Sequence, residues 1–407
     1  MSRPIIENVA TTSLDTVEPQ LAARMRAAMP VAQRWAYFDH AAVAPLSEPA
    51  RETLVAYAEQ AARDGDTVWP TWARRVEEVR SIAAALIQAA ADEIAFVKNT
   101  TDGITVVAEG FPWQSGDNIV TLANEFPSNQ YPWLNLASRG VETRRVEPEE
   151  AGEGGVIGRF NLDRVAAACD RRTRMISVSW VGYASGYRLD LDAAARLAHS
   201  VGARLFVDAI QGLGVFPLDV SQTPIDYLAA DGHKWLLGPE GAGILYVRRE
   251  RLDELRPIGV GWHSVVQGSD YAKIDLAFKP AAQRFEGGSQ NMPGVLALGA
   301  SLDLLASLSA EFGRDAIARR VVAVADEACR RLTEIGATIA SDRSPSHASG
   351  IVSFAPRGGN PDTLRRQALQ ANVALSCRAG RLRVSPHAYN DSRDIERLIS
   401  ALAENAL

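Results

Sequence analysis

The 407-residue chain is long enough for two or three domains, and its 47% hydrophobic and 23% charged residues are typical of a globular protein. Its net charge of −6 predicts no basic face for nucleic acid, and no apolar run reaches the ~18–20 residues that a membrane helix needs. Cys169, Cys329 and Cys377 form neither a disulfide framework nor a zinc motif, and the start has no signal-peptide core, so we expect a reduced, cytoplasmic protein without a metal site.

The first ninety residues are predicted to be mainly helical. Residues 1–30 are weakly patterned, and we expect them to pack on a small domain formed later in the chain. A short aromatic strand then leads into a turn of small residues around His40, where a ligand could approach the backbone. We include His40 among the candidate substrate-binding residues, although a plain strand-to-helix turn also explains this pattern.

A strand at 93–97 is followed by hydroxyl residues at the start of a helix. Free amides and the Thr100 and Thr101 hydroxyls would suit a phosphate there, and an ordinary helix cap is the alternative. The next strand, at 118–122, precedes Phe126, whose ring could lie flat on a cofactor or simply pack in the core.

Two later strands deliver chemistry at their carboxyl ends. Asp208 ends one strand, and His233 and Lys234 follow the next. In an open parallel sheet, ligands sit at this edge, so an acid and an amine there can converge on one ligand. Pyridoxal phosphate (PLP) needs a lysine for its Schiff base and a carboxylate for its pyridinium nitrogen. A desolvated lysine would have the neutral, nucleophilic amine that this bond requires.

The order of the elements predicts the architecture. Strands and helices alternate from about 93 to 247, which predicts a mixed, largely parallel sheet with helices on both faces. An irregular, glycine-rich connection covers 257–290, and its length suggests a functional or interface loop. We therefore expect an N-terminal segment (1–30), a large PLP-binding domain (31–290) and a small C-terminal α/β domain (291–407).

Several of these motifs, in this order, resemble the class V aminotransferase family. These are fold-type I PLP enzymes that include cysteine desulfurases, selenocysteine lyases and isopenicillin N epimerase-like proteins. The strongest matches are the segments 207–211, 231–234 and 238–241, and the resemblance extends from Tyr37 to about Leu402. It implies an aspartate aminotransferase-like fold, in which a mostly parallel, seven-stranded sheet is flanked by helices and joined to a smaller C-terminal domain.

The resemblance also implies roles for individual residues. Lys234 would form the Schiff base and carry the proton at the alpha carbon, with Asp208 on the pyridine nitrogen and Gln211 on the phenolic oxygen. Thr100, Thr101 and His233 would bind phosphate, and Ser289 would reach the phosphate of a partner subunit, which implies a homodimer. Arg383 would clamp the substrate carboxylate, a task that suits a bidentate guanidinium.

The chain also departs from the desulfurase pattern. Phe126 stands where desulfurases stack a histidine on the ring, so stacking is kept but an acid/base imidazole is lost. The connection from Cys377 to Arg383 is too short for the mobile loop that carries the desulfurase cysteine. Tyr183 replaces an Asn, and Asp231 replaces a hydroxyl residue that touches phosphate. A carboxylate there would repel the phosphate, so we expect Asp231 to point elsewhere or to bond a neighbour.

These observations predict a PLP enzyme that acts at the alpha carbon of an amino acid through Lys234. The leading interpretation is a class V aminotransferase-type transferase or a related C–S lyase or epimerase. A cysteine desulfurase or selenocysteine lyase is the alternative within this class, and a non-catalytic PLP-fold binding protein lies outside it. A nicotinamide dehydrogenase and a serine hydrolase are disfavoured, because no glycine fingerprint and no Gly-x-Ser-x-Gly elbow occur.

Overall fold

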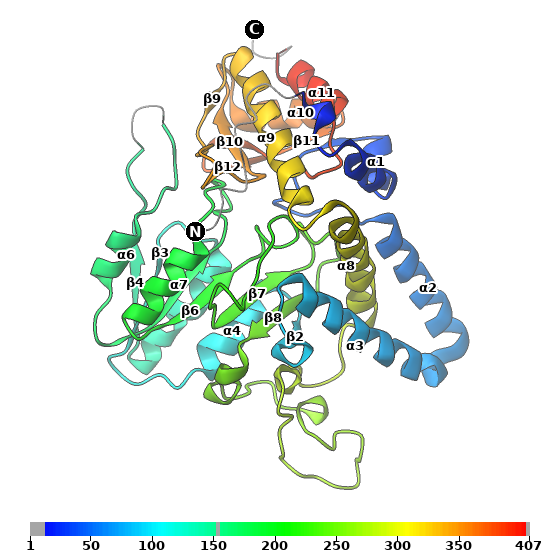
Figure 1. Cartoon of the computed structure of the whole chain (residues 1–407), viewed down its shortest axis with the longest axis vertical. Coiled ribbons are helices and arrows are strands. Elements are labelled where there is room, and N and C mark those ends of the chain that lie inside the picture. Colours follow the sequence, from blue (N-terminus) through cyan, green and yellow to red (C-terminus); the bar gives the residue numbers. More distant parts are fainter. Residues whose placement is uncertain (1–12, 152–154, 404–407) are drawn as a thin grey trace.

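A computed structural model describes residues 13–151 and 155–403. A large domain is built around a central sheet, and a small domain with its own sheet lies above it in Figure 1. Most of the active-site candidates lie in the large domain at the carboxyl ends of its strands, and Arg383 reaches the same cavity from the small domain.

The large sheet confirms the predicted architecture. In the described part of the chain it has seven strands in the order β2-β8-β7-β6-β5-β3-β4. Every neighbouring pair is parallel except those that β8 makes with β2 and β7. The strands are β2 (Ile94–Val97), β3 (Asn118–Leu122), β4 (Glu142–Val146), β5 (Thr173–Ser179), β6 (Arg204–Asp208), β7 (Tyr227–Asp231) and β8 (Gly243–Val247).

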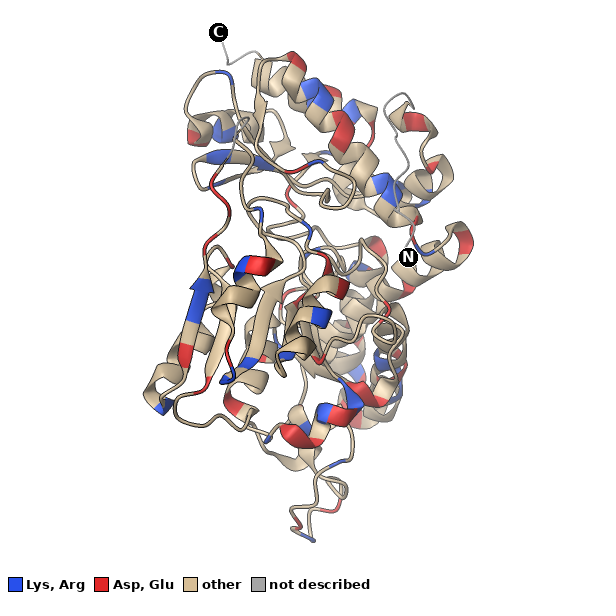
Figure 2. Cartoon of the chain, turned by 60° about the vertical axis from the view of Figure 1, so that its left-hand side comes forward, with Lys and Arg blue, Asp and Glu red and all other residues tan. Residues whose placement is uncertain are grey.

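Both faces of this sheet are covered, which explains why its strands read as continuous apolar runs. Along β6, Phe206 packs into one hydrophobic cluster, and Leu205 and Val207 pack into the other. The helices of the large domain are α2 (Glu48–Asp64), α3 (Trp69–Leu86), α4 (Thr100–Gly110), α5 (Tyr131–Asn135), α6 (Leu162–Ala168) and α7 (Leu191–Ser200). Positive and negative residues are interspersed over the helices in the view of Figure 2, and the edge strand β4 carries several of them.

Helix α4 packs directly on the sheet because of one glycine. A Cβ on Gly103 would lie 2.7 Å from the Cβ of Ala229 in β7, closer than side chains approach in proteins. The glycine therefore lets the first turn of α4 lie against the carboxyl end of β7, where the candidate phosphate-binding residues meet Lys234.

The small domain has an antiparallel sheet in the order β12-β13-β10-β9. Its elements are β9 (Thr338–Ile339), β10 (Val352–Ala355), β12 (Ser376–Arg378), β13 (Arg381–Val384), α9 (Ala316–Glu334), α10 (Pro361–Gln370) and α11 (Ser392–Ala403). Strand β1 (Ala36–Tyr37) pairs in parallel with β11 (Val373–Ala374), which joins the start of the chain to this domain.

The described part of the N-terminal segment packs on the small domain. Residues 1–12 lie outside the described part, but Leu14 packs in the core of the small domain, and α1 (Pro19–Ala27) follows it. The Arg26 guanidinium lies 2.8 Å from the Asp394 carboxylate of α11.

Helix α8 (Met292–Phe312) connects the domains. By length and composition it could cross a membrane, yet it packs against α2 and α3, and much of it is buried, as in a core helix. The domain boundary at 291 stays a prediction, because this helix packs on the large domain and also leads into α9.

Candidate active site

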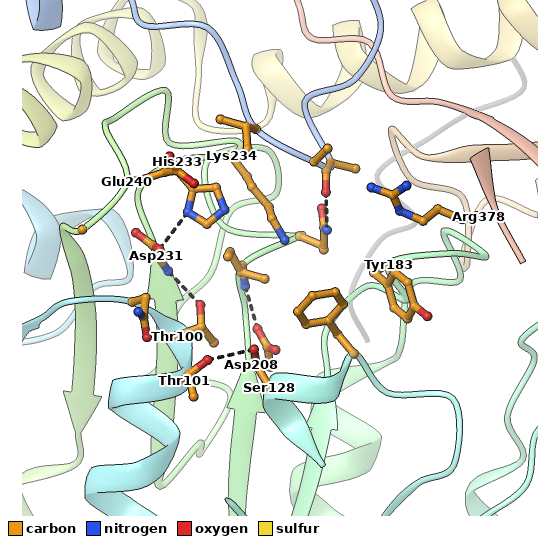
Figure 3. Close-up of a pocket in the computed structure, with 18 of the residues that line it drawn as sticks. Thr100, Thr101, Ser128, Tyr183, Asp208, Asp231, His233, Lys234, Glu240 and Arg378 are labelled. Atoms are coloured by element: carbon orange, nitrogen blue, oxygen red, sulfur yellow. Dashed lines mark hydrogen bonds and ion pairs between the residues drawn. The ribbon is translucent and has the colours of Figure 1, made fainter. Parts of the chain in front are cut away.

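A cavity of about 430 Å³ opens at the carboxyl ends of β6 and β7. Most of the predicted site residues line it: Thr100, Thr101, Phe126, Asp208, Gln211, His233, Lys234 and Arg383. Figure 3 shows Lys234 between Thr100 and Thr101 on one side and Tyr183 and Arg378 on the other. The cavity thus has two ends, with the lysine between them.

The acid and the amine are both buried, and burial shifts both pKa values. Lys234 is 8% exposed, and desolvation lowers its pKa to about 8, against the attraction of Asp208. Desolvation raises the pKa of Asp208 to about 6, against the Ile210 amide and the Lys234 charge. Near neutral pH the lysine is therefore partly neutral and the aspartate is mostly ionised, as a nucleophilic amine beside a charge-stabilising acid requires.

One end of the cavity is the N-terminus of α4. Asn99 caps this helix by accepting a hydrogen bond from the Asp102 amide at 2.9 Å. Thr101 Oγ1 donates to Ser128 Oγ at 2.8 Å, and the Asp231 amide donates to Thr100 Oγ1 at 3.0 Å. Hydroxyls and helix N–H groups gathered in this way form an anion site. Ser128 could not be predicted from the sequence, because its loop carries no local pattern that marks it.

Asp231 also lines the cavity, but its carboxylate contacts its own neighbours. One carboxylate oxygen accepts from the Gly232 amide at 2.7 Å, and the other lies 2.7 Å from His233 Nδ1. Both carboxylate oxygens of Asp231 are therefore occupied by Gly232 and His233, and the contact fixes the His233 imidazole beside the anion site.

The middle of the cavity has a polar floor and an aromatic wall. Gln211 is fixed by the Trp235 indole N–H, which donates to its Oε1 at 2.8 Å, and by its own Nε2, which donates to the Ala41 carbonyl at 2.9 Å. Phe126 is 41% exposed and meets Tyr183 edge to face, with ring centroids 5.2 Å apart. Its ring centre lies 5.5 Å from Lys234 Nζ, so an apolar surface borders the amine.

Two of the predicted residues do not line the cavity. His40 is 0% exposed, with Nδ1 2.9 Å from the Ser385 carbonyl and Nε2 2.9 Å from the Tyr389 hydroxyl. Burial holds the pKa of His40 well below its usual range, and the ring does not line the cavity. Ser289 is exposed outside the cavity of its own chain.

The other end of the cavity carries two arginines. Arg383 of β13 is 1% exposed, and its guanidinium donates to Ser376 Oγ at 3.0 Å and to the Tyr183 carbonyl at 2.6 Å. A third bond, to Asp39 Oδ1 at 3.1 Å, is also an ion pair. Arg378 lines the cavity as well. The sequence signal for it is strand periodicity, because Arg378 lies two residues after Ser376 and therefore on the same face of β12.

Cys377 lies between Ser376 and Arg378 on β12 and does not line the cavity. Burial and the nearby Asp362 carboxylate raise the pKa of its thiol, which keeps it protonated at neutral pH. No cysteine of the described residues lines the cavity.

The donor set fits PLP. A nearly buried lysine, a buried carboxylate, an anion site at a helix N-terminus and an aromatic wall converge on one cavity. These are the groups that a Schiff base, a pyridinium nitrogen, a phosphate and a flat ring need.

The comparisons with known proteins agree with this arrangement. A family model described as Aminotransferase class-V matches residues 36–398. A probable cysteine desulfurase from Methanothermobacter thermautotrophicus is 31% identical, over 94% of this chain and 97% of that protein. A cysteine desulfurase from Dickeya dadantii is 33% identical, over 81% of this chain and 80% of its own.

Solved structures share the fold. The apo structure of a cysteine desulfurase from Thermococcus onnurineus NA1 has a TM-score of 0.83 at 24% identity and covers 94% of this chain and 98% of that one. A C-DES variant with glycine covalently linked to its PLP cofactor has a TM-score of 0.85 at 22% identity and covers 93% of this chain and 99% of that one. The chain therefore belongs to the class V aminotransferase family and is a PLP-dependent enzyme of fold type I.

Proposed function

We propose that the chain is a PLP-dependent lyase that cleaves the C–S bond of cysteine or a closely related sulfur amino acid by β-elimination. The relatives named above are cysteine desulfurases, which supports a sulfur amino acid as substrate more than it supports transamination. The observation that carries the lyase assignment is a cavity that holds Lys234 and Asp208 but no thiol among the described residues.

The protein groups have distinct tasks in this proposal. PLP, when bound, supplies the electron sink for the charge that develops at the alpha carbon. Lys234 Nζ would hold the cofactor through a Schiff base and would accept the proton from the substrate's alpha carbon. Asp208, mostly ionised at neutral pH, would keep the pyridine nitrogen protonated. The α4 N-terminus, with Thr100, Thr101 and His233, would hold the phosphate.

β-Elimination needs no protein thiol. Loss of the alpha proton and of the β-sulfur from cysteine, followed by hydrolysis with one water, gives hydrogen sulfide, ammonia and pyruvate. A desulfurase instead passes the sulfur to an enzyme thiolate and releases alanine. Cys377 is poorly placed to accept that sulfur, because it lies outside the cavity and its raised pKa leaves little thiolate.

We also propose a homodimer. Ser289 precedes α8, at the end of the long connection that follows β8, and part of this connection extends below the large domain in Figure 1. This loop exposes Tyr271, Ile274 and Leu276 strongly, and exposed apolar side chains close together mark an interaction surface. A second copy that covers them would form the homodimer in which, by resemblance to the family, Ser289 serves the phosphate of its partner.

The test is product analysis of the PLP-loaded enzyme with L-cysteine. We expect sulfide, ammonia and pyruvate in equal amounts, no turnover by Lys234→Ala, and unchanged rates for Cys377→Ser and for the matched control Cys169→Ser. Alanine as the product, with sulfur release lost only in Cys377→Ser, would establish a desulfurase and refute the elimination. Conversion of a keto acid into an amino acid, with no sulfide, would instead establish an aminotransferase, which the same thiol-free cavity also favours.

A further inference from the structure

We infer that Glu125 is a positioning residue that carries the proton of a buried carboxyl pair, so that its neighbour Asp208 stays ionised and can serve the pyridine nitrogen. The inference rests on the proposed role of Asp208 toward PLP, and it does not depend on which amino acid is the substrate. Glu125 lies between the end of β3 and Phe126, beside the cofactor cavity but outside its lining.

The unequal lengths of two neighbouring strands explain the position of Glu125. Strand β3 ends at Leu122, whereas β5 continues to Ser179. Thr121 pairs with Ser177, so the Ser179 amide, two residues farther along, faces a place that β3 has already left. Glu125 Oε1 accepts a hydrogen bond from this amide at 2.6 Å, and Oε2 accepts one from the Ser179 hydroxyl. The side chain thus replaces the missing strand partner, without which a buried amide would be costly.

The same contact brings Glu125 close to Asp208. Ser179 of β5 pairs with Asp208 of β6 in parallel register, so their side chains leave the sheet on the same face. Both acids are buried, with Glu125 7% exposed and Asp208 3% exposed. The space beside Glu125 is about 10 Å³, which admits one water at most, so bulk solvent does not screen the two carboxyl groups from each other.

The two acids differ in what offsets a negative charge. Asp208 lies within reach of the Lys234 amine, whose positive charge stabilises the ionised carboxylate. Glu125 forms no ion pair with any residue that the structure describes, and the charged group that acts on it most strongly is Asp208, which repels it. The other titratable groups that border the small space beside Glu125 are the Tyr183 and Tyr187 phenols, and neither of them is a cation.

One proton is therefore expected on this carboxyl pair. Two negative charges in a poorly solvated site repel each other, and the proton goes to the acid that lacks a cation, which is Glu125. Burial raises the pKa of Glu125 to about 7 and that of Asp208 to about 6, which is the same order. A protonated Glu125 can donate from Oε2 to the Ser179 hydroxyl oxygen, while its Oε1 keeps the bond to the Ser179 amide. Asp208 then stays charged without a second carboxylate beside it.

The test follows the protonated carboxyl of the PLP-loaded enzyme by infrared spectroscopy, because its C=O stretch is separate from that of carboxylates. We expect a protonated carboxyl signal at pH 6 that Glu125→Gln lacks. The signal should disappear as the pH rises, and Asp208→Asn should move its midpoint down by roughly one pH unit, because the repelling charge is gone. Ser179→Ala should move it up, because the ionised form loses a hydrogen bond. Asp163→Asn, on the surface at the start of α6, is the control and should leave the signal and its midpoint unchanged.

A second measurement connects the pair to the cofactor. Glu125→Leu removes both acceptors and leaves the Ser179 amide unpaired next to Phe126, so it should raise the apparent Kd of PLP at least about fivefold. Glu125→Gln keeps a neutral group with the same hydrogen bonds and should recover most of this loss, because the neutral form is the one that the site uses. The midpoint shift in Asp208→Asn tests the pair in a chain whose Glu125 is intact, so the result does not depend on how well Glu125→Leu folds.

The outcomes separate this inference from the lyase. A carboxyl signal that survives in Glu125→Gln, or a midpoint that Asp208→Asn leaves in place, would overturn the inference. A signal that behaves as expected in an enzyme that releases no sulfide from cysteine would refute only the lyase. A shifted midpoint in Asp208→Asn with unchanged cofactor absorbance would keep the carboxyl pair but refute its role toward PLP.

Discussion

Asp208→Asn tests how the buried acid and amine set the reactivity of Lys234. With a pKa of about 8, roughly one Lys234 amine in ten is neutral at pH 7, whereas an ordinary lysine has about one in a few thousand. Burial produces this gain, and the Asp208 charge opposes it. Replacing the carboxylate by an amide removes the opposing attraction. The pKa of Lys234 should therefore fall further, and the neutral fraction at pH 7 can rise by at most about tenfold.

The assay is the rate at which the apoenzyme takes up PLP, followed by absorbance from pH 5.5 to 9. In the wild type the rate should rise with pH through a midpoint near the pKa of about 8. Asp208→Asn should move that midpoint to lower pH and speed attachment at pH 7, up to the tenfold limit, while substrate turnover falls because the pyridine nitrogen loses its acid partner.

The surface substitution Asp163→Asn, at the start of α6, is the control and should leave the midpoint unchanged. A midpoint that stays in place or moves to higher pH in Asp208→Asn would refute the reasoning, because the Asp208 charge would then not raise the pKa of Lys234.

The remaining predictions concern groups around the site. Burial raises the pKa of Glu125 to about 7, while its carboxylate accepts hydrogen bonds from the Ser179 amide and hydroxyl. A raised folded-state pKa stabilises the fold below the unfolded value and loses that contribution as pH rises through about 7, by about 3 kcal/mol at most. Glu125→Gln should flatten this decline between pH 5 and 8, and an unchanged pH dependence of Tm would contradict the assignment. Gly103→Ala should cost about 1–3 kcal/mol and weaken PLP affinity, because its Cβ would press α4 away from Ala229; unchanged thermal unfolding and PLP titration would show that the helix yields freely.

Much of the fold and the centre of the site could be predicted from local pattern. Continuous apolar runs bounded by turns marked the strands at 205–208 and 226–231, because a strand buried on both faces has no polar side. Polar residues at the ends of such strands must meet at one edge of a parallel sheet, so Asp208 and Lys234 could be paired without coordinates. The first turn of α4 follows the end of β2, and its hydroxyl residues predicted a phosphate site at a helix N-terminus.

The outer part of the site was decided by contacts between distant segments. The backbone of Asp39 forms a parallel β-bridge with Ser385, so two segments far apart in the sequence lie side by side. This pairing buries the neighbouring His40 and brings the Asp39 carboxylate to Arg383. Local periodicity carries no record of which segment pairs with which, so a histidine in a small-residue turn looked available to a substrate. The same limit hid Arg378, which lines the cavity together with Arg383.

By itself the sequence therefore determined the family, the layered fold and the cofactor's reactive centre, because these depend on short motifs and on strand and helix periods. The tertiary structure alone decided that Cys377 lies outside the cavity, that His40 is buried and that Arg378 lines the cavity with Arg383. Those properties depend on burial and on partners more than 300 residues away in sequence, such as Asp39 for Arg383, and only the packed chain brings such groups together.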